Sequence, residues 1–163
     1  MDPAGRHVSR FANLADAGAQ LAVRVRDARI DDPLVLAVIP NGVPVALPVA
    51  SALGVRAIGL PVDRRDEPVV HEVPDVRGRR VIVVDDGVET GRVARAVQSA
   101  LRPAGPAELL LAVPVCSREA MAALDYDRII AVETPFGRRS LAWHFDDFDV
   151  IDDARAQALL AGS

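Results

Sequence analysis

Two adjacent carboxylates at the end of an apolar run are the residues of this chain best suited to chemistry. Asp85 and Asp86 directly follow four β-branched residues at positions 81–84. Such a run predicts a buried strand, and Asp is disfavoured inside strands, so the pair is expected at the strand end with a binding partner. Paired carboxylates can bind sugar hydroxyls or organise a Mg²⁺ ion. The alternative is that they only cap the loop that follows; we favour the binding role.

The segment after the two carboxylates is suited to binding a phosphate group. It reads Gly-Val-Glu-Thr-Gly over residues 87–91, and a helical run then extends over residues 92–101. A tight loop that leads into a helix presents unpaired backbone N–H groups to an anion. Gly91 allows the backbone to come close to the ligand, and Thr90 adds a hydroxyl. Strand, acidic pair, loop and helix together predict a site for a phosphorylated sugar.

This segment resembles the phosphoribosyl-pyrophosphate (PRPP) signature of the type I phosphoribosyltransferases. That signature is an apolar strand, two acidic residues, a few variable residues and Thr-Gly, and residues 81–93 have the same order. The resemblance implies that Asp85 and Asp86 hold the ribose 2′- and 3′-hydroxyls, directly or through Mg²⁺. It also implies a cradle for the 5′-phosphate, which consists of Gly87, Val88, Glu89, Thr90, Gly91, Arg92 and Val93.

Two residues of this cradle depart from the simplest phosphate site. Most relatives carry Ser or Thr at the position of Val93, so one hydroxyl is missing, and a hydrogen bond to a charged group contributes about 1.5–3 kcal/mol. Glu89 matches the acidic residue proposed as the general base in 6-oxopurine phosphoribosyltransferases, which implies the same role here. A carboxylate beside a phosphate loop also repels the ligand, and the sequence leaves both interpretations open.

A second loop, Pro40-Asn41-Gly42, resembles the pyrophosphate loop of the same family. A subgroup of bacterial relatives carries Pro-Arg-Gly-Gly before Val-Pro-Val-Ala, whereas this chain has Pro-Asn-Gly before those four residues. Asn41 therefore replaces a guanidinium group. All basic residues of the chain are Arg, so Arg64 or Arg65 is the candidate cation for pyrophosphate. The alternative for these two arginines is a solvated charge run, in a connection shorter than the flexible loop of relatives.

Aromatic residues gather near the C-terminus. Trp143 is the only Trp and is a candidate for stacking on a nucleobase. Packing of Trp143, Phe145 and Phe148 into the core is favoured over stacking, because aromatic side chains more often pack than bind. Cys116 is the only cysteine, and no His pattern accompanies it, so it is interpreted as a buried apolar residue and not as a nucleophile.

The elements that must position these residues alternate along the chain. Apolar runs predict strands at 34–39, 55–62, 81–84, 108–115 and 128–132. Helices are expected at 11–28, 43–53, 92–101 and 151–160, and residues 121–124 belong to a further helix with a candidate cap at 117–119. This alternation predicts an α/β fold with a parallel twisted sheet flanked by helices. The resemblance implies the type I phosphoribosyltransferase fold, which we expect as a single domain over residues 1–163. Both loops follow strands, so they are expected to face one crevice.

Composition limits the classes of partner. The net charge of −4 gives no electrostatic reason to expect nucleic acid. No apolar run approaches the ~20 residues of a membrane span, and residues 1–6 lack an apolar signal core. A single cysteine excludes an intramolecular disulfide and favours a reducing compartment. We therefore expect a cytoplasmic protein without a membrane partner.

The residues and the resemblance together predict a Mg²⁺-dependent phosphoribosyltransferase. It would transfer the 5-phosphoribosyl group between PRPP and a nitrogen nucleophile, a nucleobase-like small molecule, with Asp85, Asp86 and Glu89 as the catalytic residues. The alternative is a catalytically weak or inactive PRPP- or nucleotide-binding regulatory protein on the same fold, which Asn41, Val93 and the short connection suggest. Whether the chain is an active enzyme stays open at this point, and a homodimer is expected by analogy with the family.

Overall fold

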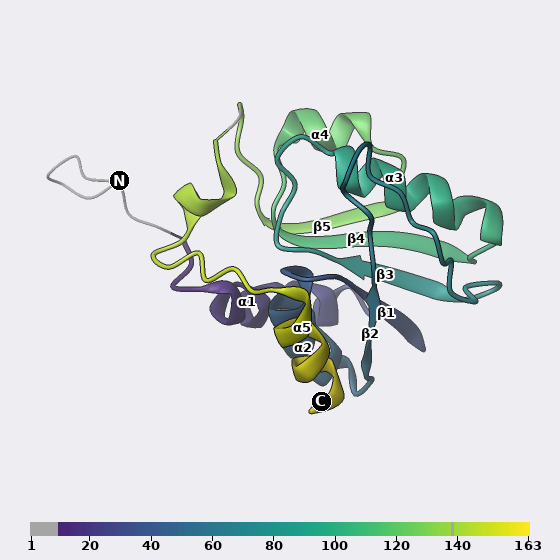
Figure 1. Ribbon diagram of the computed structural model, residues 1–163. Helices are drawn as coiled ribbons and strands as arrows, with labels where there is room; N and C mark the ends of the chain where they lie inside the picture. The colour runs from purple at the N-terminus through teal and green to yellow at the C-terminus, as the bar shows by residue number, and fades with distance from the viewer. Residues whose placement is uncertain (1–9, 138) are drawn as a thin grey trace, which may run out of the picture.

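Five parallel strands form the centre of the molecule (Figure 1). The computed structural model describes residues 10–137 and 139–163. The strands are β1 (Pro33–Val38), β2 (Ala57–Leu60), β3 (Arg80–Val84), β4 (Glu108–Val115) and β5 (Arg128–Glu133). Their order across the sheet is β2-β1-β3-β4-β5, and every neighbouring pair is parallel. The predicted α/β class with a parallel sheet is confirmed.

The strand order reverses between β1 and β3. From β1 the chain crosses to β2 on one side, and from β3 it proceeds to β4 and β5 on the other side. Ala37 of β1 is paired with Val84 of β3, so the two strands end next to each other. Ligands of open parallel sheets bind at such a reversal point, beyond the carboxyl ends of the strands.

Helices cover both faces of this sheet (Figure 1). One face carries α1 (Leu14–Asp27), α2 (Gly42–Leu53) and α5 (Asp153–Ala161), and the other carries α3 (Arg92–Leu101) and α4 (Arg118–Ala123). Short 3₁₀ helices lie at Arg102–Ala104 (η1) and Leu141–His144 (η2). In the part of the chain that the structure describes, no helix has the length and apolar character needed to cross a membrane.

The boundaries of these helices and strands lie within three residues of the predicted ones, and the larger differences have local causes. The predicted cap of α4 is confirmed: the Oγ of Ser117 accepts a hydrogen bond from the N–H of Ala120 (3.2 Å), so the helix begins at Arg118. Strand β2 is shorter than the predicted 55–62, and the chain on either side of it leaves the sheet. Pro48 lies inside α2.

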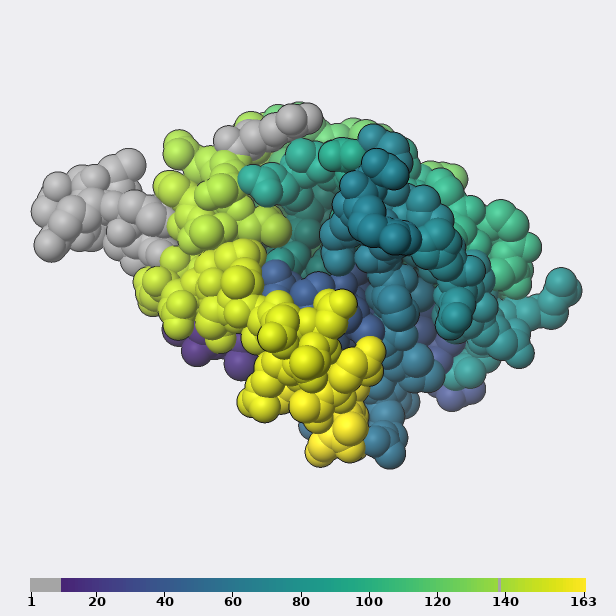
Figure 2. Space-filling model, in the orientation of Figure 1, coloured from purple at the N-terminus to yellow at the C-terminus, as the bar shows by residue number. Residues whose placement is uncertain are grey.

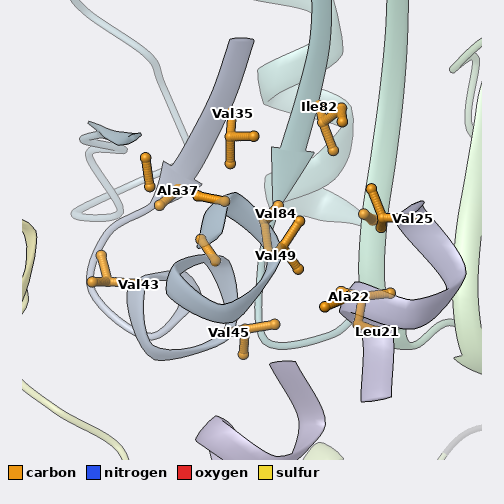
Figure 3. Packing of buried hydrophobic residues seen from close by; sticks show 14 of the residues in the cluster. Leu21, Ala22, Val25, Val35, Ala37, Val43, Val45, Val49, Ile82 and Val84 are labelled. Carbon is orange, nitrogen blue, oxygen red and sulfur yellow. The ribbon is translucent and has the colours of Figure 1, made fainter. Parts of the chain in front are cut away.

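Two apolar cores separate the sheet from its helices. Val35 and Ala37 of β1 face the core beneath α1 and α2, whereas Leu36 and Val38 face the core beneath α3. Figure 3 shows the first core, with side chains of β1 and β3 packed against those of α1 and α2. All six residues of β1 are buried. This double burial explains why the strand appears in the sequence as a continuous apolar run.

Gly18 lets α1 and α2 pack closely. A Cβ atom at Gly18 would lie 2.6 Å from the carbonyl oxygen of Val45 and 3.0 Å from Cγ of Pro48. We expect Gly18→Ala to lower the free energy of unfolding by about 1–3 kcal/mol through overpacking, although Ala is the better helix former. Urea denaturation would measure this change. Gly162→Ala is the control, because a Cβ there meets only ordinary contacts; equal stability of the two variants would contradict the expectation.

Candidate active site

A cavity of about 400 Å³ opens at the carboxyl ends of β1 and β3. In Figure 2 a hollow lies on this side of the molecule, between the yellow-green segment that follows β5 and the teal segment that follows β2. The residues that line the cavity are Pro40, Asn41, Arg64, Asp85, Asp86, Gly87, Val88, Glu89, Thr90, Gly91, Arg92, Val93, Ala94 and Leu141. The loop after β1 and the loop after β3 therefore line one cavity.

The acidic pair lies at the base of the loop after β3, and both residues are partly buried. The N–H of Asp86 donates to Oδ1 of Asp85 at 2.8 Å. Burial raises the pKa of the Asp85 carboxyl well above its usual value, and the charge of Asp86 raises it further. Burial also raises the pKa of Asp86, although its hydrogen bonds with Asp85 and Asn41 oppose this shift. Two enclosed carboxylates of this kind favour a bound cation or proton.

Gly42 brings the loop after β1 against this pair. A Cβ atom at Gly42 would lie 2.7 Å from the carbonyl oxygen of Val84 and 3.2 Å from Cα of Asp85. Only a residue without a side chain allows this approach, because the atoms in the way belong to the backbone of β3 and of the residue that follows it. The Gly in the Pro-Asn-Gly loop is thus explained by its contact with the acidic pair.

The loop of residues 87–91 is fixed at its base and open at the helix end. The N–H of Val88 donates to the carbonyl oxygen of Val115 at 2.8 Å, which holds the loop beside β4. Gly91 has a φ of 82° and provides the turn into α3, where its carbonyl oxygen accepts from the N–H of Arg95 (2.8 Å). The first N–H groups of a helix have no intrahelical partner. That of Arg92 donates to Oγ1 of Thr90 at 3.4 Å, and those of Val93 and Ala94 are available to an anion.

The structure separates the two arginines of the connection between β2 and β3. Nη1 of Arg64 donates to the carbonyl oxygen of Ile39 at 2.9 Å, which places its guanidinium in the cavity beside Pro40. Arg65 is exposed and pairs with Asp63 at 2.6 Å, and it does not belong to the cavity lining. Arg64 alone of the two candidates is therefore brought to the acidic pair.

Asn41 links three parts of the site. Its Oδ1 accepts a hydrogen bond from the N–H of Ile151 at 3.0 Å. Asn41 also lines the cavity together with Asp86, and its side chain lowers the pKa of that carboxyl. The residue in the position of the family's guanidinium thus connects the loop after β1, the acidic pair and the C-terminal segment. The sequence contained no signal for the contact with Ile151, which is 110 positions away.

The segment after β5 covers the cavity with an aliphatic side chain. Leu141 lines the cavity, and a Cβ atom at Gly87 would lie 2.6 Å from its Cδ2, so the two residues are in close contact. Trp143 is 39% exposed and lies outside the lining, so the favoured packing of this residue into the core is wrong. Its ring lies 5.0 Å from that of His144, and the guanidinium of Arg139 is over it at 4.5 Å. Two residues of the lining, Leu141 and Ala94 of α3, were not among the predicted site residues.

The other residues of the aromatic cluster pack inside the molecule, as the favoured alternative predicted. The rings of Phe145 and Phe11 are 5.2 Å apart, and the ring of Phe148 lies 5.0 Å from that of Phe145. Cys116 is fully buried, and this burial raises the pKa of its thiol to about 11. A thiol with such a pKa is a poor nucleophile near neutral pH, which agrees with the interpretation of Cys116 as an apolar residue.

Comparison with known proteins identifies the family. Residues 7–136, more than three quarters of the chain, match the phosphoribosyl transferase domain. The chain belongs to the phosphoribosyltransferase family. Among curated relatives, the bifunctional protein PyrR of Roseiflexus sp. strain RS-1 is 38% identical over 106 residues, which cover 54% of this chain and 58% of that protein. The PyrR of Listeria monocytogenes strain HCC23 is 46% identical over 55 residues, 31% of this chain and 30% of that protein.

Solved structures confirm the type I phosphoribosyltransferase fold. The structure of TT1426 from Thermus thermophilus superposes with a TM-score of 0.82 at 24% identity and covers 94% of this chain and 98% of that one. A purine phosphoribosyltransferase from Pyrococcus horikoshii superposes with a TM-score of 0.60 at 21% identity, over 85% and 92% of the two chains. At these identities the likeness establishes the fold alone. The chain matches less than two thirds of the length of the PyrR proteins named above.

Proposed function

We propose that this chain transfers the 5-phosphoribosyl group between PRPP and a nitrogen nucleophile, a nucleobase-like small molecule. One observation carries this proposal: the acidic pair, the start of α3 and the loop after β1 line the same cavity. PRPP has three groups that need recognition, namely a 5′-phosphate, ribose hydroxyls and a pyrophosphate. The cavity offers a suitable set of groups for each of them.

Each wall of the cavity would bind one part of PRPP. The N–H groups at the start of α3, with the hydroxyl of Thr90, would bind the 5′-phosphate. Asp85 and Asp86 would accept hydrogen bonds from the ribose hydroxyls. The loop after β1 would bind pyrophosphate with the help of the Arg64 guanidinium, which replaces the cation that Asn41 lacks.

Mg²⁺ fits the chemistry of this pair. Carboxylate oxygens are the ligands that Mg²⁺ prefers, and the raised pKa values indicate that a cation near the pair is favourable. Within residues 10–137 and 139–163 no group of three or more His, Cys, Asp or Glu side chains converges on one point. Asp85 and Asp86 would therefore supply the protein ligands, and oxygens of PRPP the others. When bound, the ion would neutralise negative charge on the pyrophosphate.

Transfer breaks the bond between ribose C1 and the pyrophosphate oxygen and forms a bond from C1 to the acceptor nitrogen. Positive charge develops on the ribose in between, and the two nearby carboxylates stabilise it. Glu89 lies at the exposed rim of the cavity. There it would accept the proton from the acceptor as a general base, while Leu141 shields the reacting atoms from water.

Calorimetric titration with PRPP, with and without Mg²⁺, tests the binding half of the proposal. We expect binding that depends on Mg²⁺, followed by turnover with at least one member of a panel of nucleobases. Absence of PRPP binding under both conditions would refute the assignment of the site. The same purified protein in a light-scattering experiment would test the homodimer that we propose by family analogy.

A non-catalytic role is the second candidate. Val93 removes a phosphate-binding hydroxyl and Asn41 removes a cation, so a protein that binds PRPP or a nucleotide in order to regulate a partner is also compatible with the cavity. Tight binding without turnover across the whole panel of bases would favour this role. Turnover at an ordinary enzymatic rate, about 1–10³ per second, would exclude it.

A further inference from the structure

The connection between β2 and β3 forms a small hairpin beside the cavity. Asp63 and Val69 exchange two backbone hydrogen bonds, of 2.8 and 2.9 Å, and close a loop of residues 64–68. The carboxylate of Asp63 also contacts Arg65 (2.6 Å) and His71 (2.9 Å). The root of the hairpin is therefore held by several bonds, and these do not involve its tip.

The tip of the hairpin reaches the phosphate side of the cavity. Oε1 of Glu67 lies 2.7 Å from Nη2 of Arg92, which is the first residue of α3 and part of the cavity lining. Arg64 of the same hairpin bonds to Ile39, next to the loop after β1. The hairpin of residues 63–69 thus contacts both walls, with a cation at the pyrophosphate wall and a carboxylate at the phosphate wall.

We propose that the carboxylate of Glu67 forms an ion pair with the guanidinium of Arg92, which the 5′-phosphate of PRPP would otherwise bind. This competition lowers the affinity of the site for PRPP. This inference rests on the function proposed above. Arg92 is the first residue of α3, at the helix end where a phosphate would bind. Guanidinium groups pair with phosphate and carboxylate in the same geometry. Before Arg92 can bind the phosphate, it must release Glu67, and the released carboxylate repels the ligand until the tip moves away.

The ion pair between Glu67 and Arg92 contributes little to the stability of the fold. The side chains of Arg92 and Glu67 are 54% and 81% exposed, and ion pairs in such positions add little to stability. The root of the hairpin and the bond from Arg64 to Ile39 do not depend on it. Glu67 can therefore be changed without displacing Arg64, so an effect on affinity would come from the phosphate wall.

The test is the affinity of Glu67→Gln for PRPP with Mg²⁺, measured by calorimetry at low ionic strength, where exposed charges act most strongly. We expect a Kd that is about two- to fivefold lower than that of the natural protein, the range of one exposed ion pair, with an unchanged melting temperature. Glu72→Gln removes the same charge from an exposed position later in the same connection and should leave the Kd unchanged. In an Arg92→Gln background, Glu67→Gln should bring no gain.

The outcomes test the role of Glu67 and the proposed function separately. If the natural protein binds PRPP and Glu67→Gln binds it equally or more weakly, the role of Glu67 is wrong and the proposed function stands. An equal gain in Glu72→Gln would reduce the effect to net charge and overturn the specific role. Binding by Glu67→Gln alone would support both proposals, whereas absence of binding by either protein would overturn both.

Discussion

The double variant Asp85→Asn with Asp86→Asn is expected to lose Mg²⁺-dependent binding of PRPP and to lower kcat/KM by at least about 10²–10³-fold, the effect of removing one preorganised electrostatic group. Asn keeps the size of the side chain and an oxygen that accepts hydrogen bonds, including the one from the N–H of residue 86. The loss would therefore come from the charge. Calorimetry and steady-state kinetics would measure it, and unchanged activity would refute the role of the pair.

Removal of the Asp85 carboxylate is expected to make the folded protein more stable at neutral pH. The pKa of Asp85 in the folded protein lies above its usual value of 3.8, so the folded state binds more protons than the unfolded state at pH values between these two pKa values. The contribution of Asp85 to stability is fully present below pH 3.8 and is lost as the pH rises through the folded-state pKa. Asp85→Asn removes the carboxylate whose ionisation destabilises the folded state. The melting temperature of this variant at neutral pH should therefore exceed that of the natural protein.

Thermal unfolding across the pH range checks this expectation. The difference between Asp85→Asn and the natural protein should shrink toward zero as the pH approaches 3.8. Asp31→Asn is the control, because Asp31 is exposed in the loop before β1, at the opposite end of that strand from the cavity. A lower melting temperature for Asp85→Asn at neutral pH would show that the carboxylate is stabilised by the fold. We expect the opposite, a higher melting temperature, because the charged carboxylates of the site lower the stability of the folded protein.

Arg64→Gln is expected to have the second largest effect, a loss of about 10–100-fold in kcat/KM with PRPP. The reason is that a charge-assisted hydrogen bond to pyrophosphate contributes about 1.5–3 kcal/mol. Gln is polar but carries no charge. Kinetics with PRPP, together with the inhibition constant of pyrophosphate, would measure the loss.

Arg65→Gln is the matched control for this variant. Arg65 lies next in the chain but pairs with Asp63 outside the cavity lining, and the backbone bonds of the hairpin do not need it. We expect a change of less than about threefold, as for an exposed ion pair. Equal losses in the two variants would mean that the hairpin, and not the guanidinium of Arg64, is what the site requires.

The fold was predictable because its signals are local and long. Continuous apolar runs such as the one at 34–39 report strands that are buried on both faces, and their alternation with helices leaves few arrangements. The acidic pair and the loop of residues 87–91 were found for a related reason. Their types and spacing are fixed by one turn between one strand and one helix, and that turn is contained in the sequence itself.

The parts of the site that were not predicted depend on contacts between distant segments. Arg64 and Arg65 are equivalent in a charge run, and only the bridge between Asp63 and Val69 decides which one turns into the cavity. The bond from Ile151 to Asn41 joins residues far apart in the chain. Leu141 was overlooked in favour of an aromatic neighbour, because residue type says nothing about which side of a short 3₁₀ helix faces the ligand.

Trp143 can serve as an intrinsic fluorescent probe of the segment after β5. The chain has one Trp, and it lies two positions from Leu141 in η2, partly exposed and in contact with Arg139 and His144. Indole emission responds to nearby charge and to water, and with a single indole the signal has one source. All tryptophan fluorescence of this protein therefore originates in the segment that contributes Leu141 to the cavity, so a change of emission on addition of PRPP would report a change in that segment, without a dye or a tag.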